Sequence, residues 1–239
     1  MMQQYMDAKA ACGDALLFFR MGDFYELFFE DARIAAEKVG LTLTSRDKNS
    51  DNPVPMAGFP HRQLEGYLGK LISHGLRVAI CEQVEDPKKA KGLVKRDITR
   101  VVTPGTLTDD ALLDPRENNY LASVAAERAG HNAGPNARVG VAWVELSTGR
   151  FWAATVPADR LSDELGRIQP SECLVVEDED PLNSSIREEV MVTARPAWEF
   201  GFEASQEVLA KQFGTSTLEG FGFDDDDRLA IRAAGAVVA

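Results

Sequence analysis

Short apolar runs and helical periodicities alternate along the first hundred residues and predict a small domain of mixed secondary structure. Residues 16–19 are four consecutive apolar side chains, typical of a short buried strand, and Gly22 permits a sharp turn after them. Over residues 25–39 apolar side chains recur at helical spacing, which predicts an amphipathic helix with Asp23 as its N-cap. The full order is helix, strand, helix, loop, helix, strand, basic loop and strand, which indicates a mixed α/β unit.

Phe24 and Glu26 stand at the start of this predicted helix, and each has two interpretations. Phe24 lies about a quarter-turn from the centre of the apolar stripe, so it is either a core or staple residue or a side chain that contacts a ligand. Glu26 follows Asp23 by three residues and either closes a capping box or contacts the same ligand. Residues two apart on a regular helix point about 200° apart, so both face one ligand only at a frayed helix start.

The pattern changes near residue 120, where strands in hairpin order precede alternating helices and strands. Strands are predicted over residues 120–126, 139–146, 151–156, 173–177 and 190–193, and helices over residues 158–168, 183–189, 205–214 and 225–239. Residues 108–119 are acidic and turn-forming, which indicates a linker. The predicted organisation is therefore a first domain of residues 1–107, the linker, and a second α/β domain of residues 120–239.

Composition excludes several classes of protein. With 239 residues, 44% of them hydrophobic, the chain is long enough for two ordinary domains. It contains no run of about 18 apolar residues and begins with no apolar signal segment, so neither a membrane span nor secretion is expected. Its three cysteines and three histidines are scattered, which favours reduced thiols in a cytoplasm and predicts no metal site.

The net charge of −12 is located almost entirely in the second domain. Through Leu107 there are 15 lysines and arginines against 14 aspartates and glutamates, a balance of +1. The remainder has 11 against 24, a balance of −13. Residues 88–100, KKAKGLVKRDITR, carry six basic side chains and one acidic one. This segment is either a solvated loop or a surface that neutralises phosphates, with Lys91, Lys95 and Arg96 as candidate contacts.

Four sequence blocks in fixed order carry a family resemblance. They are GDFYELF at 22–28, PVPMAGFPHRQLEGYLGKL at 53–71, VAICEQ at 78–83 and VTPGT at 102–106, with STGRF at 147–151 as a weaker fifth. Together they resemble the amino-terminal part of the MutS family of DNA mismatch-recognition proteins, most strongly over about residues 1–120. The resemblance implies a small mixed-sheet α/β mismatch-recognition domain followed by a ribonuclease-H-like α/β connector domain.

The resemblance also implies a site. In the family, the phenylalanine of the Phe-Tyr-Glu motif stacks on a mispaired or unpaired base and the glutamate hydrogen-bonds to that base; by position these are Phe24 and Glu26. The family pattern places Met21 and Met56 near the distorted base pair, although lone methionines are often core gap-fillers. Asp23 and Arg46 complete the candidate DNA contacts.

The chemistry of these residue types fits that role. A mismatch pairs and stacks poorly, so the duplex is easier to kink there. A protein that bends DNA can therefore distinguish a mismatch by the lower energy of deformation. A phenylalanine wedge stacks on any base, whereas an ionised carboxylate is repelled by phosphates and discriminates only when it finds a base partner or a proton. We therefore expect the pKa of Glu26 to rise in the complex.

Two enzyme hypotheses and one interaction hypothesis compete with this interpretation. A two-metal nuclease would need clustered carboxylates, but only Glu145 occupies a suitable strand, and residues 177–180 read as a solvated strand terminus. An ATPase would need a GxxxxGK[ST] loop, which is absent. The resemblance implies that ATP and Mg bind a carboxy-terminal domain outside this chain, so no cofactor is expected here. In the interaction hypothesis, the acidic second domain contacts a MutL-type partner without binding DNA.

The expected partners follow from the same resemblance. Mismatched double-stranded DNA is expected at the first domain and a MutL-type repair protein at the second. These 239 residues resemble an amino-terminal fragment, expected to be a monomer, of a full-length homodimer that works in the bacterial cytoplasm on the nucleoid.

Overall fold

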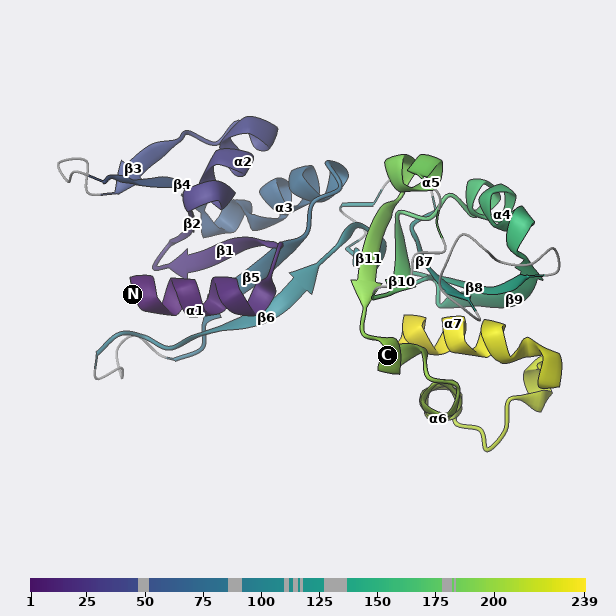
Figure 1. Ribbon diagram of the computed structural model, residues 1–239. Helices are drawn as coiled ribbons and strands as arrows, with labels where there is room; N and C mark the ends of the chain where they lie inside the picture. Colours follow the sequence, from purple (N-terminus) through teal and green to yellow (C-terminus); the bar gives the residue numbers. More distant parts are fainter. Residues whose placement is uncertain are drawn as a thin grey trace. The chain divides into compact units, whose positions relative to one another are not determined.

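The computed structural model describes residues 1–46, 52–85, 92–109, 112–113, 116, 118–126, 137–177, 182 and 184–239. The chain divides into two compact units, Met1–Pro104 and Gly105–Ala239 (Figure 1). None of the described helices is long and apolar enough to cross a membrane.

Unit 1 is built on one mixed sheet. Its elements are α1 (Met2–Cys12), β1 (Leu16–Met21), β2 (Phe24–Phe28), α2 (Phe29–Val39), β3 (Thr44–Arg46), β4 (Val54–Pro60), η1 (His61–Gln63), α3 (Leu64–Ser73), β5 (Val78–Gln83) and β6 (Arg96–Val102). The strand order is β3-β4-β2-β1-β5-β6, in which β1 and β5 are parallel and the other neighbours antiparallel. Helix α1 lies over one face, and α2 and α3 lie together on the other side (Figure 1).

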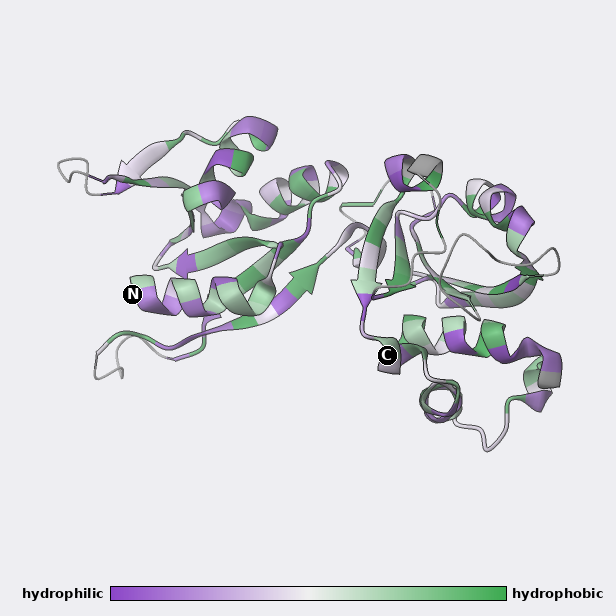
Figure 2. Cartoon of the chain, viewed as in Figure 1, coloured by the Kyte–Doolittle hydropathy of each residue, from purple (hydrophilic) through white to green (hydrophobic). Residues whose placement is uncertain are grey.

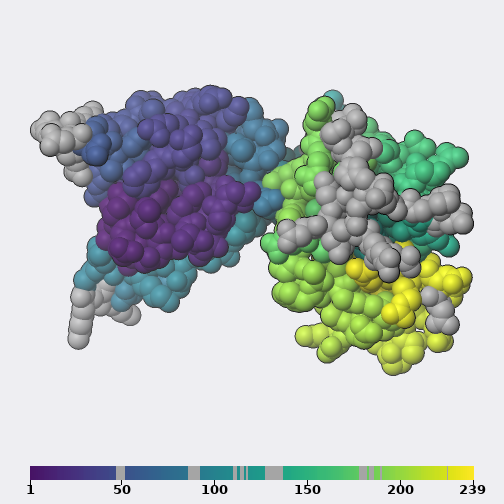
Figure 3. Space-filling view, viewed as in Figure 1, coloured from purple at the N-terminus to yellow at the C-terminus, as the bar shows by residue number. Residues whose placement is uncertain are grey.

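The apolar pattern of β1 explains the centre of this unit. Its first four residues are fully buried, as the sequence predicts for a strand covered on both faces. Hydrophobic residues concentrate along β1 and β5 (Figure 2). Tyr5 of α1 packs edge-on against Phe19 and Phe28, with ring centroids 5.5 and 4.9 Å apart, and so ties the helix to the sheet. In Figure 3 this amino-terminal segment, in purple, forms part of the surface of unit 1.

The predicted helix of residues 25–39 is wrong in its first part. The segment 24–28 is strand β2, which forms a hairpin with β1, and the helix begins only at Phe29. Asp23 is consequently not an N-cap, and Glu26 closes no capping box: the N-cap of α2 is Phe28, with no side-chain cap. Aromatic and branched side chains favour strands, and over so short an apolar run helical and strand periodicities cannot be separated.

Strands β3 and β4 are also missing from the predicted order. The stretch around them is polar and turn-rich, which the sequence interpretation takes for a loop. Pairing with β2 stabilises β4 there. The register runs from Phe24 opposite Pro60 to Phe28 opposite Met56, and the pairing gives the backbone N–H and C=O groups of β4 hydrogen-bond partners. Tertiary pairing therefore decides the conformation of this segment.

Unit 2 contains a five-stranded mixed sheet in the order β11-β10-β7-β8-β9. Its elements are η2 (Pro104–Thr106, at the boundary), β7 (Tyr120–Ala126), β8 (Arg138–Glu145), β9 (Arg150–Pro157), η3 (Ala158–Arg160), α4 (Leu161–Ile168), β10 (Glu172–Val176), α5 (Ser184–Glu189), β11 (Met191–Arg195), η4 (Ala197–Phe200), α6 (Phe202–Phe213), η5 (Glu219–Phe221), η6 (Asp225–Asp227) and α7 (Arg228–Val238). Strands β7, β8 and β9 are antiparallel neighbours, whereas β10 is parallel to both β7 and β11. The predicted α/β fold of hairpin strands followed by alternation is confirmed.

Helix α7 packs very closely on the sheet of unit 2. A Cβ atom at Gly140 of β8 would lie 1.9 Å from the carbonyl oxygen of Leu229 in α7. One at Gly235 of α7 would lie 2.2 Å from the hydroxyl oxygen of Ser205 in α6. Both glycines are therefore required for space, and they set the distances among β8, α7 and α6.

Candidate nucleic-acid interface

The hairpin between β1 and β2 presents the candidate residues of unit 1. Its two-residue loop is Gly22 and Asp23, with Gly22 at a φ of 58°, a positive value that a glycine adopts without steric cost. His61 holds this loop from η1: its backbone N–H and its ring Nδ1 both donate to the carbonyl oxygen of Asp23, at 2.8 and 3.1 Å. The loop is thus anchored by a second segment.

The strand register places most of the candidates on one face of the sheet. Met21 pairs with Phe24 and Phe19 with Glu26 across the hairpin. Directly opposite residues of antiparallel strands point to the same face, as do residues two apart on one strand. The same rules extend the face across β4, β3 and β6. The candidates that share it are Met21, Phe24, Glu26, Arg46, Met56 and Arg96.

This geometry removes the need for a frayed helix. On a strand, Phe24 and Glu26 point the same way because side chains alternate with a period of two. Tyr25, between the two, and Leu27, which follows Glu26, are buried on the opposite face. There the ring of Tyr25 packs against that of Phe59, with centroids 5.6 Å apart. The buried residues thus fix the side to which the pair points.

Phe24 is the most exposed phenylalanine of unit 1. Phe18, Phe19, Phe28 and Phe59 are fully buried and 37% of Phe29 is exposed, whereas 47% of Phe24 is exposed. Its ring stacks on no aromatic side chain among the described residues. An exposed aromatic at a hairpin tip has an apolar face available to a planar ligand.

Glu26 is half-buried and hydrogen-bonds to no group in the described part of the chain. Burial raises the pKa of its carboxyl above the ordinary value of 4.5, while Arg46 and then Arg96 oppose that rise. A carboxylate that has lost water without gaining a hydrogen-bond partner is poised to accept one from a ligand or to take up a proton.

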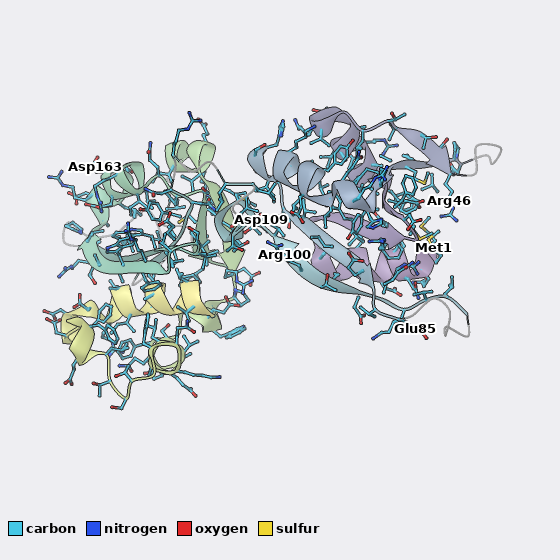
Figure 4. The ribbon with its side chains drawn as sticks, turned by 180° about the vertical axis from the view of Figure 1, so that it is seen from behind. Met1, Arg46, Glu85, Arg100, Asp109 and Asp163 are labelled. Carbon is cyan, nitrogen blue, oxygen red and sulfur yellow. The ribbon has the colours of Figure 1, made fainter. Side chains whose placement is uncertain are left out.

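The two arginines flank Glu26 from opposite edges of the sheet. Arg46 of β3 lies beside Met1, with its Nη1 3.7 Å from the sulfur, and Figure 4 shows the two labelled side chains near each other. Arg96 of β6 donates from Nε to the carbonyl oxygen of Arg20 at 2.7 Å and from Nη1 to Gln4 at 3.0 Å. Burial lowers the pKa of Arg96, and Glu26 is among the charges that raise it.

The remaining candidates are placed less directly. Met56 and Met21 border the core cluster under α1, so they are both packing residues and neighbours of the pair. Asp23 contributes its backbone carbonyl to the His61 anchor. Lys95 pairs with Asp97 at 2.8 Å, and Lys91 lies outside the described residues.

Sequence reasoning missed two residues of this candidate interface. Gly58 lies directly opposite Glu26 on β4, and His61 anchors the turn. Both belong to the block PVPMAGFPHR, so a strand assignment for that block would have found them. A glycine within a strand is in itself a signal of close approach.

Glu145 of unit 2, the carboxylate considered for a nuclease site, is hydrogen-bonded within its own turn. Glu145, at the end of β8, accepts a hydrogen bond from the hydroxyl of Thr148 at 2.6 Å and so stabilises the turn into β9. Among the described residues, no group of three or more histidines, cysteines, aspartates or glutamates is arranged to hold a metal ion. Residues 178–180, part of the predicted acidic terminus, lie outside the described residues.

Comparison with known proteins defines the class of the two units. Residues 1–111 match the family model of MutS domain I, and residues 119–239 match that of MutS domain II. The chain is 56% identical over 250 residues to the DNA mismatch repair protein MutS of Rhodopirellula baltica. That similarity takes in 100% of this chain but only 28% of the length of its relative. The chain belongs to the MutS family of DNA mismatch repair proteins. The two matched domains include no ATPase domain, as predicted.

Proposed function

We propose that unit 1 recognises mispaired or unpaired bases in duplex DNA, with Phe24 as a wedge that stacks on the base. The observation that carries this proposal is the shared face of Phe24 and Glu26 on one strand, beside Arg46 and Arg96. The exposed ring supplies stacking area without a preference for one base, and the arginines supply positive charge for phosphates. Membership of the MutS family supports the same function.

Glu26 is the discriminating member of the pair in this proposal. Its carboxylate repels the phosphates of ordinary duplex. This repulsion is offset only when a base edge becomes available to form a hydrogen bond with the carboxylate. The partial desolvation already present in the free chain raises the pKa of this carboxyl, and the phosphates of bound DNA add to that direction. A Glu26→Gln variant that discriminated mismatches as well as the unchanged chain at every pH would exclude this role.

The test of the wedge is a pair of binding curves, measured by fluorescence anisotropy at fixed salt with mismatched and matched duplexes. Phe24→Ala removes a stacking contact worth about 1–3 kcal/mol, so the ratio of the two dissociation constants is expected to fall towards one. The matched control is Phe221→Ala, the same substitution at a similarly exposed phenylalanine (56%) of unit 2. Equal effects of the two substitutions, or an unchanged ratio in Phe24→Ala, would contradict the proposal.

We further propose that unit 2 couples recognition to other parts of the repair machinery. Its support is the charge balance of −13 after Leu107, which suits contact with a protein rather than with phosphates. A MutL-type protein is the proposed partner, and ATP hydrolysis is proposed for the longer protein, outside these 239 residues. Retention of a MutL-type protein on an immobilised unit 2 that retains no DNA would support this division; retention of DNA by unit 2 would contradict it.

A further inference from the structure

We propose that Gly58 is a specificity-determining residue of the mismatch site. The inference rests on the proposed function: the missing side chain at this position keeps the sheet face open beside the Glu26 carboxylate, so that a base edge can reach it. The residue lies on β4, outside the Phe-Tyr-Glu motif.

The requirement for glycine at this position is one of space. Gly58 is not among the glycines with a positive φ, so its backbone conformation is open to any residue. A Cβ atom there would lie 2.9 Å from the carbonyl oxygen of Tyr25 and 3.5 Å from Cγ of Glu26. The first distance is shorter than a real contact allows, and the obstructing atom belongs to the backbone, which cannot turn aside as a side chain does.

A glycine at this position of β4 lowers the stability of the strand, so its presence needs an explanation. Glycine weakens a strand because it loses more conformational freedom on folding than other residues and packs nothing. Its neighbours Ala57 and Phe59 are fully buried on the opposite face of β4, where Phe59 contacts Phe18 and Tyr67. The core thus fixes β4 in place, while Gly58 itself is exposed on the face that carries Glu26.

The consequence is a gap in the sheet surface next to a carboxylate that lacks a hydrogen-bond partner in the described part of the chain. Across β2, the other residue opposite Glu26 is Phe19, which is covered by α1. The open approach to Glu26 along the sheet is therefore over the backbone of Gly58. A flat base edge can lie against a bare strand, whereas a methyl group would hold it away.

The experiment is a double-mutant cycle on the ratio of dissociation constants for matched and mismatched duplex. The chains are the unchanged chain, Gly58→Ala, Glu26→Ala and the double variant. Gly58→Ala is expected to lower the ratio about ten-fold, the effect of losing one hydrogen bond to a charged group. In the Glu26→Ala background the same substitution is expected to change the ratio less than about two-fold, because the group that it obstructs is gone.

A stability control separates obstruction from unfolding. Phe59→Leu weakens the same strand from its buried side, so it should lower the urea midpoint of unit 1 and leave the binding ratio of the remaining folded chain unchanged. Gly58→Ala should lower the ratio even where circular dichroism shows an unchanged fold.

The outcomes distinguish this inference from the proposed function. If Glu26→Ala leaves the ratio unchanged, the proposed reading of the base by Glu26 fails, and the role of Gly58 fails with it. If Glu26→Ala lowers the ratio but Gly58→Ala does not, only the role of Gly58 is overturned. An equal effect of Gly58→Ala with and without Glu26, or an equal loss in Phe59→Leu, also overturns it.

Discussion

Asp31 is a buried charge in unit 1 whose removal has a calculable effect. The carboxylate lies in the first turn of α2, is almost fully buried, and accepts hydrogen bonds from the backbone N–H of Leu17 at 3.0 Å and from Nζ of Lys9 at 2.9 Å. It thereby joins α1, β1 and α2. Asp31→Asn preserves shape, but the amide can accept from only one of these donors and turns its own N–H groups towards the other.

The expected loss of stability follows from the state of the remaining partner. Removing one member of a buried ion pair costs about 3–5 kcal/mol, because the other charge stays buried without compensation. Lys9 keeps 27% of its side chain exposed, so water screens part of its charge, and the lower end, about 3 kcal/mol, applies. Lys9→Met combined with Asp31→Asn should recover part of this loss, since no half-buried ammonium is then left without its carboxylate partner.

The assay uses the distribution of tryptophan in the chain. All three tryptophans, at positions 143, 152 and 198, belong to unit 2, so their fluorescence in urea reports that unit and serves as an internal control. Hydrogen exchange of peptides covering α1 and β1 reports unit 1. Asp31→Asn should accelerate exchange there and leave the fluorescence midpoint unchanged. A loss below about 1 kcal/mol, or an equal shift of both units, would refute the reasoning.

Three further predictions concern other parts of the chain. Gly140→Ala should cost unit 2 about 3 kcal/mol, because its methyl group displaces Leu229 and with it α7; an unchanged fluorescence midpoint in urea would contradict this. Glu26, whose pKa burial raises above 4.5, gains a proton as the pH falls and then no longer repels phosphates, so acidification at fixed salt should tighten mismatch binding more in the unchanged chain than in Glu26→Gln; parallel titrations would count against it. Burial raises the pKa of Cys81 to about 11 and of Cys173 to about 12, so at pH 8 both should react with a disulfide reagent only after unfolding, unlike the half-buried Cys12; rapid labelling of Cys81 or Cys173 in the native chain, located by peptide mapping, would disprove this.

The sequence predicts unit 2 better than unit 1 for a physical reason. Strands such as residues 120–126 are long apolar runs separated by clear turn signals, and their assignment needs no knowledge of their partners. The segment around Tyr25 carries apolar residues compatible with both a helix and a strand, and the choice depends on pairing with β1 and β4. Local pattern contains no information about such pairing.

The residues of the candidate site also divide into those that local sequence identifies and those that only strand pairing brings together. Phe24 and Glu26 are identifiable from a motif, because the motif is contiguous in sequence. Gly58 and His61 become neighbours of the pair only through the register of β4 and the contact of η1 with the hairpin loop. The helical interpretation also creates a conflict of about 200° between Phe24 and Glu26, and this conflict is itself evidence against a helix.

In the proposed function, the spacing of Phe24 and Glu26 on a strand constrains how unit 1 can meet a duplex. Residues two apart on a strand are separated by about 7 Å along its axis, and successive nucleotides of one DNA strand by about 3.4 Å. A β2 that ran along the duplex would therefore place the wedge and the carboxylate at levels two base steps apart. To address a single base with both side chains, β2 must cross the groove, with the hairpin tip entering first.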